Sequence, residues 1–158
     1  MPLTRRALVS ALALCGVATP VFGAAELSRG PVTDLPLPRY VSLKTDRVNL
    51  REGPSKDHST RWVFQRAGLP VEIIAEFETW RRIRDAEGAE GWVLHSLLSG
   101  RRTALVMPWS KSDAVPVPLF ERAAEDAEVV ARLLPNVIIN VRQCTGSWCR
   151  VTVISESN

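Results

Sequence analysis

The sequence predicts an all-β protein in which a small barrel occurs twice, the second copy incomplete, behind an export signal and an extended arm. Short runs of β-branched and aromatic residues, separated by glycine and proline turns, fill most of the chain after the signal, and helical periodicity is almost absent. Residues 69–83 also align with residues 137–151 without a gap. A length of 158 residues accommodates one ordinary domain or two very small ones.

The N-terminal segment 1–25 is typical of a signal peptide. Arg5 and Arg6 precede a short apolar run, and the small residues Gly23, Ala24 and Ala25 follow it. We expect cleavage after Ala25, by either the general or the twin-arginine export route. The apolar run is shorter than the roughly 20 residues of a membrane span, so we expect a periplasmic or secreted protein with no membrane span in its mature form.

The charge balance argues against nucleic acid as a partner. The chain has 20 Lys and Arg against 17 Asp and Glu, and two of the arginines lie in the predicted signal. The remaining chain is therefore almost neutral. Its arginines are interspersed with acidic residues, whereas a nucleic-acid binder concentrates uncompensated basic residues on one surface.

Two cysteines remain after the signal, Cys144 and Cys149 in the stretch CTGSWC. Disulfides persist in exported proteins, and Gly146 suits a tight turn, so we predict a disulfide across a hairpin. A zinc site needs four ligands, but His58 and His95 are the only histidines and neither is near the cysteines in sequence. No metal and no cofactor are expected.

The Pro-containing residues 26–45 are interpreted as an extended arm, because Pro36 and Pro38 favour polyproline-like backbone. We expect this arm to fold back on the barrel and to help hold the two units together. Residues 46–100 are expected to form the first barrel, with strands in RVNLREGPS, LPVEIIAEFE, WRRIRD and WVLHSLL, and with a hairpin turn at Gly88 and Gly91. Its expected core is Val71, Ile73, Ile83, Val93 and Leu97.

The internal repeat extends this organisation to the C-terminal part. The ungapped alignment places Trp80 on Trp148 and Ile83 on Val151, and a slippage by one position matches Leu50 with Leu119. Residues 101–115 are expected to form a linker strand, and residues 116–158 the second unit.

The first unit resembles the bacterial SH3-like domain over residues 46–98. The similarity is carried by RVNLREGPS, by the turn at Gly68 and by WRRIRDAEGAEGWVLHSLL. The second unit matches only partly, since Phe120 and the two residues after it stand where the family has Arg-x-Gly-Pro. The resemblance implies a small barrel of five or six strands, and it implies peptides or cell-wall material as ligands.

The candidate ligand-binding residues are Trp62, Trp80, Trp92, Arg51 and Arg82, and they would form a shallow aromatic groove for an extended peptide. Alternatively, the tryptophans only cover the edges of a small core. A nucleophile with a positioned base is not apparent, so the chain is not expected to be an enzyme. We expect it to bind peptide, peptidoglycan or an envelope protein; the alternative is a structural or regulatory subunit of a cell-wall enzyme, and a hydrolase ranks third.

The second unit lacks a counterpart of the Gly-Trp-Val strand, because the same alignment runs past Asn158. Three arrangements are open: the natural C-terminus has been lost, residues near Leu105 to Met107 substitute for the strand, or a partner adds one by β-augmentation. We favour the first. The incomplete unit is also expected to exchange its amide hydrogens faster than the first unit and to self-associate.

Overall fold

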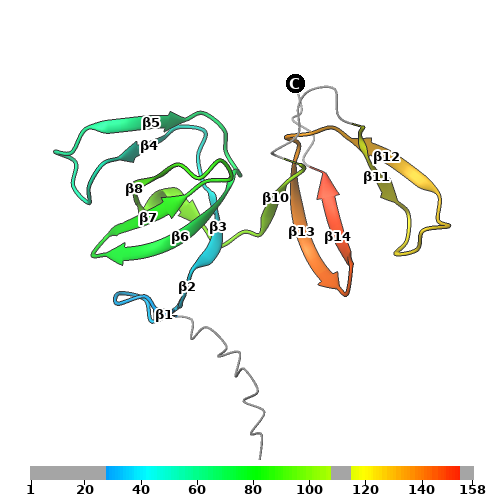
Figure 1. Cartoon of the computed structure of the whole chain (residues 1–158), viewed down its shortest axis with the longest axis horizontal. Coiled ribbons are helices and arrows are strands. Elements are labelled where there is room, and N and C mark those ends of the chain that lie inside the picture. Colours follow the sequence, from blue (N-terminus) through cyan, green and yellow to red (C-terminus); the bar gives the residue numbers. More distant parts are fainter. Residues whose placement is uncertain (1–27, 108–114, 154–158) are drawn as a thin grey trace, which may run out of the picture.

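The computed structural model describes residues 28–107 and 115–153, and these residues form antiparallel sheets (Figure 1). The predicted all-β fold is confirmed. The predicted signal peptide and its cleavage site lie outside the described residues, as does the C-terminal stretch ISESN. In the described part of the chain, no helix is long and apolar enough to cross a membrane.

The first unit is one seven-stranded sheet that curls into a barrel. Its strand order is β5-β4-β8-β7-β6-β3-β9. The elements are β3 (Arg39–Leu43), β4 (Val48–Arg51), β5 (Thr60–Phe64), β6 (Pro70–Phe77), β7 (Trp80–Arg84), β8 (Glu90–Leu94), the 3-10 helix η1 (His95–Leu97) and β9 (Leu98–Ser99).

The core of the first unit consists of the alternate, inward-facing side chains of these strands. Four of the five predicted core residues are buried, and Leu97 packs against them partly buried, as expected. The remaining buried residues of this core come from β2 (Pro36–Leu37), β3, β4 and β5. The full cluster is Leu37, Leu43, Val48, Leu50, Phe64, Val71, Ile73, Ile83 and Val93.

The predicted arm belongs largely to the barrel. Its first part forms a short pair between β1 (Ser28–Arg29) and β2 (Pro36–Leu37), and Leu37 reaches the core. The last part, β3, pairs with β6 on one side and β9 on the other. The arm assignment is therefore wrong for residues 39–43, because a proline before a strand restricts only the entry to that strand.

A buried carboxylate joins the arm to the barrel. The Glu76 side chain is fully buried and accepts hydrogen bonds from the backbone N–H groups of Val32 (3.1 Å) and Thr33 (2.9 Å) and from the Thr33 hydroxyl (2.6 Å). Arg39 donates to the same carboxylate at 2.6 Å, and Arg81 lies 3.5 Å from it. Burial alone would raise the pKa of Glu76, but the bonds from Thr33, Arg39 and Val32 outweigh it and lower the pKa to about 2.

The second unit repeats the strand pairing of the first. Strand β13 (Ile138–Thr145) pairs with β14 (Trp148–Val153) in the same register as β6 pairs with β7, once residues are matched by the sequence repeat. The irregularity in the pairing after Ile73 recurs at the equivalent position, after Val141. The pair β11 (Val117–Phe120) and β12 (Val129–Leu133) likewise repeats β4 and β5, with the slippage by one position that the sequence shows. The alignment made from the sequence is thus confirmed.

The predicted linker strand belongs to the second unit. Strand β10 (Thr103–Leu105) pairs with β13 as β3 pairs with β6. The proposal that residues near Leu105 to Met107 replace the missing Gly-Trp-Val strand is therefore wrong, because these residues already occupy the position of β3.

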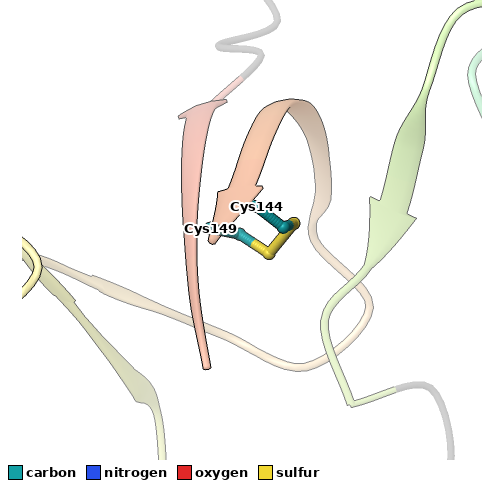
Figure 2. Close-up of a disulfide and its surroundings, with 2 residues drawn as sticks. All are labelled: Cys144 and Cys149. Atoms are coloured by element: carbon teal, nitrogen blue, oxygen red, sulfur yellow. A yellow bond between two sulfur atoms is a disulfide. The ribbon is translucent and has the colours of Figure 1, made fainter. Parts of the chain in front are cut away.

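The predicted disulfide is present between Cys144 and Cys149, which lie opposite each other on β13 and β14 (Figure 2). In the repeat they correspond to Glu76 and Arg81, which lie opposite each other on β6 and β7. A covalent bond in the second unit thus takes the place of a buried ion pair in the first.

Polar contacts join the two units near β10. The Thr103 hydroxyl donates to the Gly68 carbonyl at 2.7 Å and contacts the Ser42 hydroxyl at 2.7 Å. Arg66 donates to the Asn136 carbonyl at 2.7 Å. None of these contacts involves the segment LPLPRY, so the expectation that this segment holds the units together stays a prediction.

Candidate functional site

The candidate site lies on the outward face of β4, β7 and β8. Alternation along the β4 region turns Val48 and Leu50 into the core, which leaves Arg47, Asn49 and Arg51 on the outer face. On β7 and β8 the outward residues lie opposite one another in three pairs, Trp80 with Leu94, Arg82 with Trp92 and Arg84 with Glu90.

These strands and the loop after β4 enclose a shallow pocket of about 270 Å³. Its apolar side is formed by Trp80, Leu94 and Leu97, which come from β7, β8 and η1. Its polar side is formed by Arg47, Asn49, Arg51 and Lys56. The pocket therefore combines an aromatic floor with three cations, and no carboxylate is among its lining residues.

The loop that carries Lys56 is held in place by Arg51. The guanidinium of Arg51 donates to the carbonyl of Lys56 at 3.1 Å and to that of His58 at 2.7 Å. The neighbouring acids pair with serines of the same loop, Glu52 with Ser59 and Asp57 with Ser55. Within the described residues, no acid forms an ion pair with the three cations of the pocket, so their charge is available to an anionic ligand.

Trp80 was expected to form part of an open aromatic groove, but it is buried, with only 7% of it accessible. The turn after β8 brings η1 back over the start of β7, where the backbone N–H of His95 donates to the Thr79 carbonyl at 2.9 Å. Leu97 of this helix and Leu94 line the pocket beside the indole. Trp80 consequently forms the floor of the pocket and is not displayed on the surface.

Trp92 and Arg82 lie beside the pocket. Trp92 is half-buried and lies between Arg51 on β4 and Arg82 on β7. Arg82 pairs with the Glu90 carboxylate at 2.9 Å. This neutralisation makes Arg82 a weaker partner for an anion than Arg47 or Lys56.

Trp62 is separated from the other candidates. It lies opposite the buried Leu50, so it shares the inward face of the β4–β5 hairpin, yet 59% of it is exposed because β5 is an edge strand. The predicted groove of three tryptophans is therefore not one surface. Trp80 and Arg51 line the pocket, Trp92 and Arg82 flank it, and Trp62 lies elsewhere.

Sequence reasoning missed five of the lining residues. Alternation in RVNLR was a usable signal for two of them, since it sets Arg47, Asn49 and Arg51 on one face. Alternation along the predicted strand WVLHSLL likewise sets Leu94 on the face of Trp92. Lys56 and Leu97 carried no such signal, because their positions depend on how the loop after β4 and η1 fold back. The described residues contain no group of three or more potential metal ligands.

The strand order defines a small β-barrel module, present as one closed copy and, within the described residues, one open copy. The family model for the bacterial SH3 domain matches the sequence over residues 44–100 and again over residues 113–154. The chain therefore belongs to the bacterial SH3 domain family. No curated protein matches the sequence closely enough to count as a relative.

Proposed function

We propose that the protein is an exported, non-enzymatic binding protein of the cell envelope. Its first unit would bind an extended peptide, or the peptide part of peptidoglycan, in the pocket of β4, β7 and β8. An apolar group of the ligand would lie on Trp80, and a carboxylate would face Arg47 and Lys56. The arrangement of three cations without a lining carboxylate beside an aromatic floor carries this proposal.

Two further observations support the proposal. The disulfide between Cys144 and Cys149 is of the kind that persists in oxidising compartments such as the periplasm. His58 lies in the loop after β4 and His95 is the first residue of η1. Both are exposed, and neither contacts a serine or cysteine nucleophile in the hydrogen bonds of the described residues. Binding rather than catalysis is therefore the chemistry that these residues favour.

Reversing one charge of the pocket tests this proposal. The full-length Arg47→Glu variant should bind purified cell-wall sacculi about tenfold more weakly than wild type, a loss of about 1.4 kcal/mol. The reason is that Arg47 is exposed and forms no ion pair in the described structure, so its charge acts on the ligand. Cosedimentation over a range of protein concentrations measures the change.

Arg132→Glu is the matched control, since Arg132 is an exposed arginine on β12 of the second unit. It should bind sacculi as wild type does, and added salt should weaken wild-type binding by screening. Equal binding by Arg47→Glu and wild type would show that the pocket is not the binding site. Failure of every form to bind sacculi would argue against cell wall as the ligand and direct the same comparison to a pull-down from envelope extract.

A further inference from the structure

None of the described strands of the second unit occupies the position that β8 fills in the first. In the seven-stranded sheet, β8 lies between β4 and β7 and is antiparallel to both. The equivalents of these neighbours are β11 and β14. Among the described strands, β11 pairs with β12 alone and β14 with β13 alone, in two separate sheets (Figure 1). Each strand therefore has an edge with unused backbone donors and acceptors.

The two edges border one hollow. It has a volume of about 970 Å³, and its lining includes Leu119 and Phe120 from β11 and Trp148 and Val151 from β14. The rings of Phe120 and Trp148 meet edge to face with their centroids 5.7 Å apart. This contact joins a side chain of β11 to a side chain of β14, although the two strands do not pair with each other.

Side chains around this hollow are less covered than their counterparts. Leu50 and Ile83 are completely buried in the first unit, where Val93 of β8 belongs to the same core cluster. The corresponding Leu119 and Val151 are only half-buried. The second unit thus has space in its core for an apolar side chain equivalent to Val93, and none of its described strands supplies one.

We propose that the second unit takes up an extended segment of a partner polypeptide as a strand between β11 and β14. The repeat specifies the chemistry of this segment through β8, whose central residues are Gly91, Trp92 and Val93. A Cβ atom on Gly91 would lie 2.6 Å from Cγ of Leu50 and 2.8 Å from the Arg51 carbonyl oxygen. The partner strand therefore has glycine where it passes Leu119 and Phe120, and an apolar residue two positions later.

A partner segment fits this position better than a second copy of the chain. The one Gly-Trp-Val sequence of the chain is the central strand β8 of the first barrel, hydrogen-bonded on both sides. Releasing it would open that barrel and expose its core. A free segment with the same pattern inserts without this cost, by the strand addition known for exposed sheet edges.

A synthetic peptide of residues 87–97, EGAEGWVLHSL, tests the proposal on the full-length protein. Binding is followed with a fluorophore on the peptide, and the bound region by amide hydrogen exchange. Peptide at ten times its Kd should slow exchange about elevenfold by mass action in residues 117–120 and 148–153. Amides of β4 and β7 should not change, because their edges are already paired.

Two altered peptides serve as controls. In the first, valine replaces the glycine of the peptide that corresponds to Gly91, and binding should be abolished because the valine side chain would collide with Leu119. In the second, proline replaces the tryptophan that corresponds to Trp92, and binding should be abolished because proline has no backbone N–H to donate. Protection of residues 117–120 and 148–153 reports on the second unit alone, whereas the proposed pocket lies in the first, so failure here is distinguishable from failure of the proposed pocket. Absence of binding, binding that ignores the valine change, or protection of β11 and β14 by dimerisation without peptide would each overturn the proposal.

Discussion

Replacing Glu76 by alanine is expected to lower the free energy of unfolding by about 3–5 kcal/mol. The carboxylate is buried, and its removal leaves the guanidinium groups of Arg39 and Arg81, 18% and 7% exposed, without their anion. The backbone donors of Val32 and Thr33 lose their acceptor as well. Urea denaturation of the full-length protein measures the loss.

Glu72→Ala is the matched control for this substitution. Glu72 lies on the same strand and pairs with Arg84 at 2.6 Å, but the Arg84 side chain is 44% exposed. An exposed pair contributes about 1 kcal/mol or less, so this variant should unfold nearly as wild type does. If both variants lost a similar amount of unfolding free energy, burial of the Glu76 carboxylate would not be what determines its contribution to stability.

The same carboxylate predicts how stability depends on pH. Because the pKa of Glu76 falls from its ordinary 4.5 to about 2 on folding, its contribution is present above pH 4.5 and is lost as the pH falls toward 2. The loss amounts to about 3 kcal/mol over this interval. Glu76→Gln, which carries no charge to titrate, should show a flatter pH dependence between these limits, and an unchanged slope would contradict the assignment.

This carboxylate also shows why parts of the fold were not predictable from sequence. In the sequence, Glu76 is one of several acids on an alternating strand, and its partner Thr33 lies 43 residues away in a segment interpreted as an arm. A local pattern gives no sign of such a contact, because only the closed barrel brings the two segments together. The burial of Trp80 was missed for the same reason, since it depends on the return of η1 over β7.

Strand register was predictable, because it is fixed by the alternation of side chains and by turn positions that the sequence displays. The alignment that matched Ile83 with Val151 reproduces the observed pairing of β13 with β14, irregularity included. The candidate site was predictable only in part. Arg51 and Trp80 line the pocket, whereas Trp62 was chosen for its residue type, and residue type does not say on which face of a hairpin a side chain lies.

The two units offer one further comparison, between leucines at equivalent positions of β4 and β11. Leu50→Ala should lower the free energy of unfolding by about 3 kcal/mol or more, because Leu50 is completely buried and its removal leaves a cavity among packed side chains. Leu119→Ala should cost about 1 kcal/mol, because Leu119 is half-buried beside the hollow and solvent already reaches part of it. Hydrogen exchange in each unit, measured on the full-length variants, reports the two losses separately.

Saturating peptide of residues 87–97 should then raise the cost of Leu119→Ala toward that of Leu50→Ala, since an inserted strand would bury this leucine. Equal costs without any peptide would show that the core of the second unit is already closed, and the open position between β11 and β14 would not exist in solution.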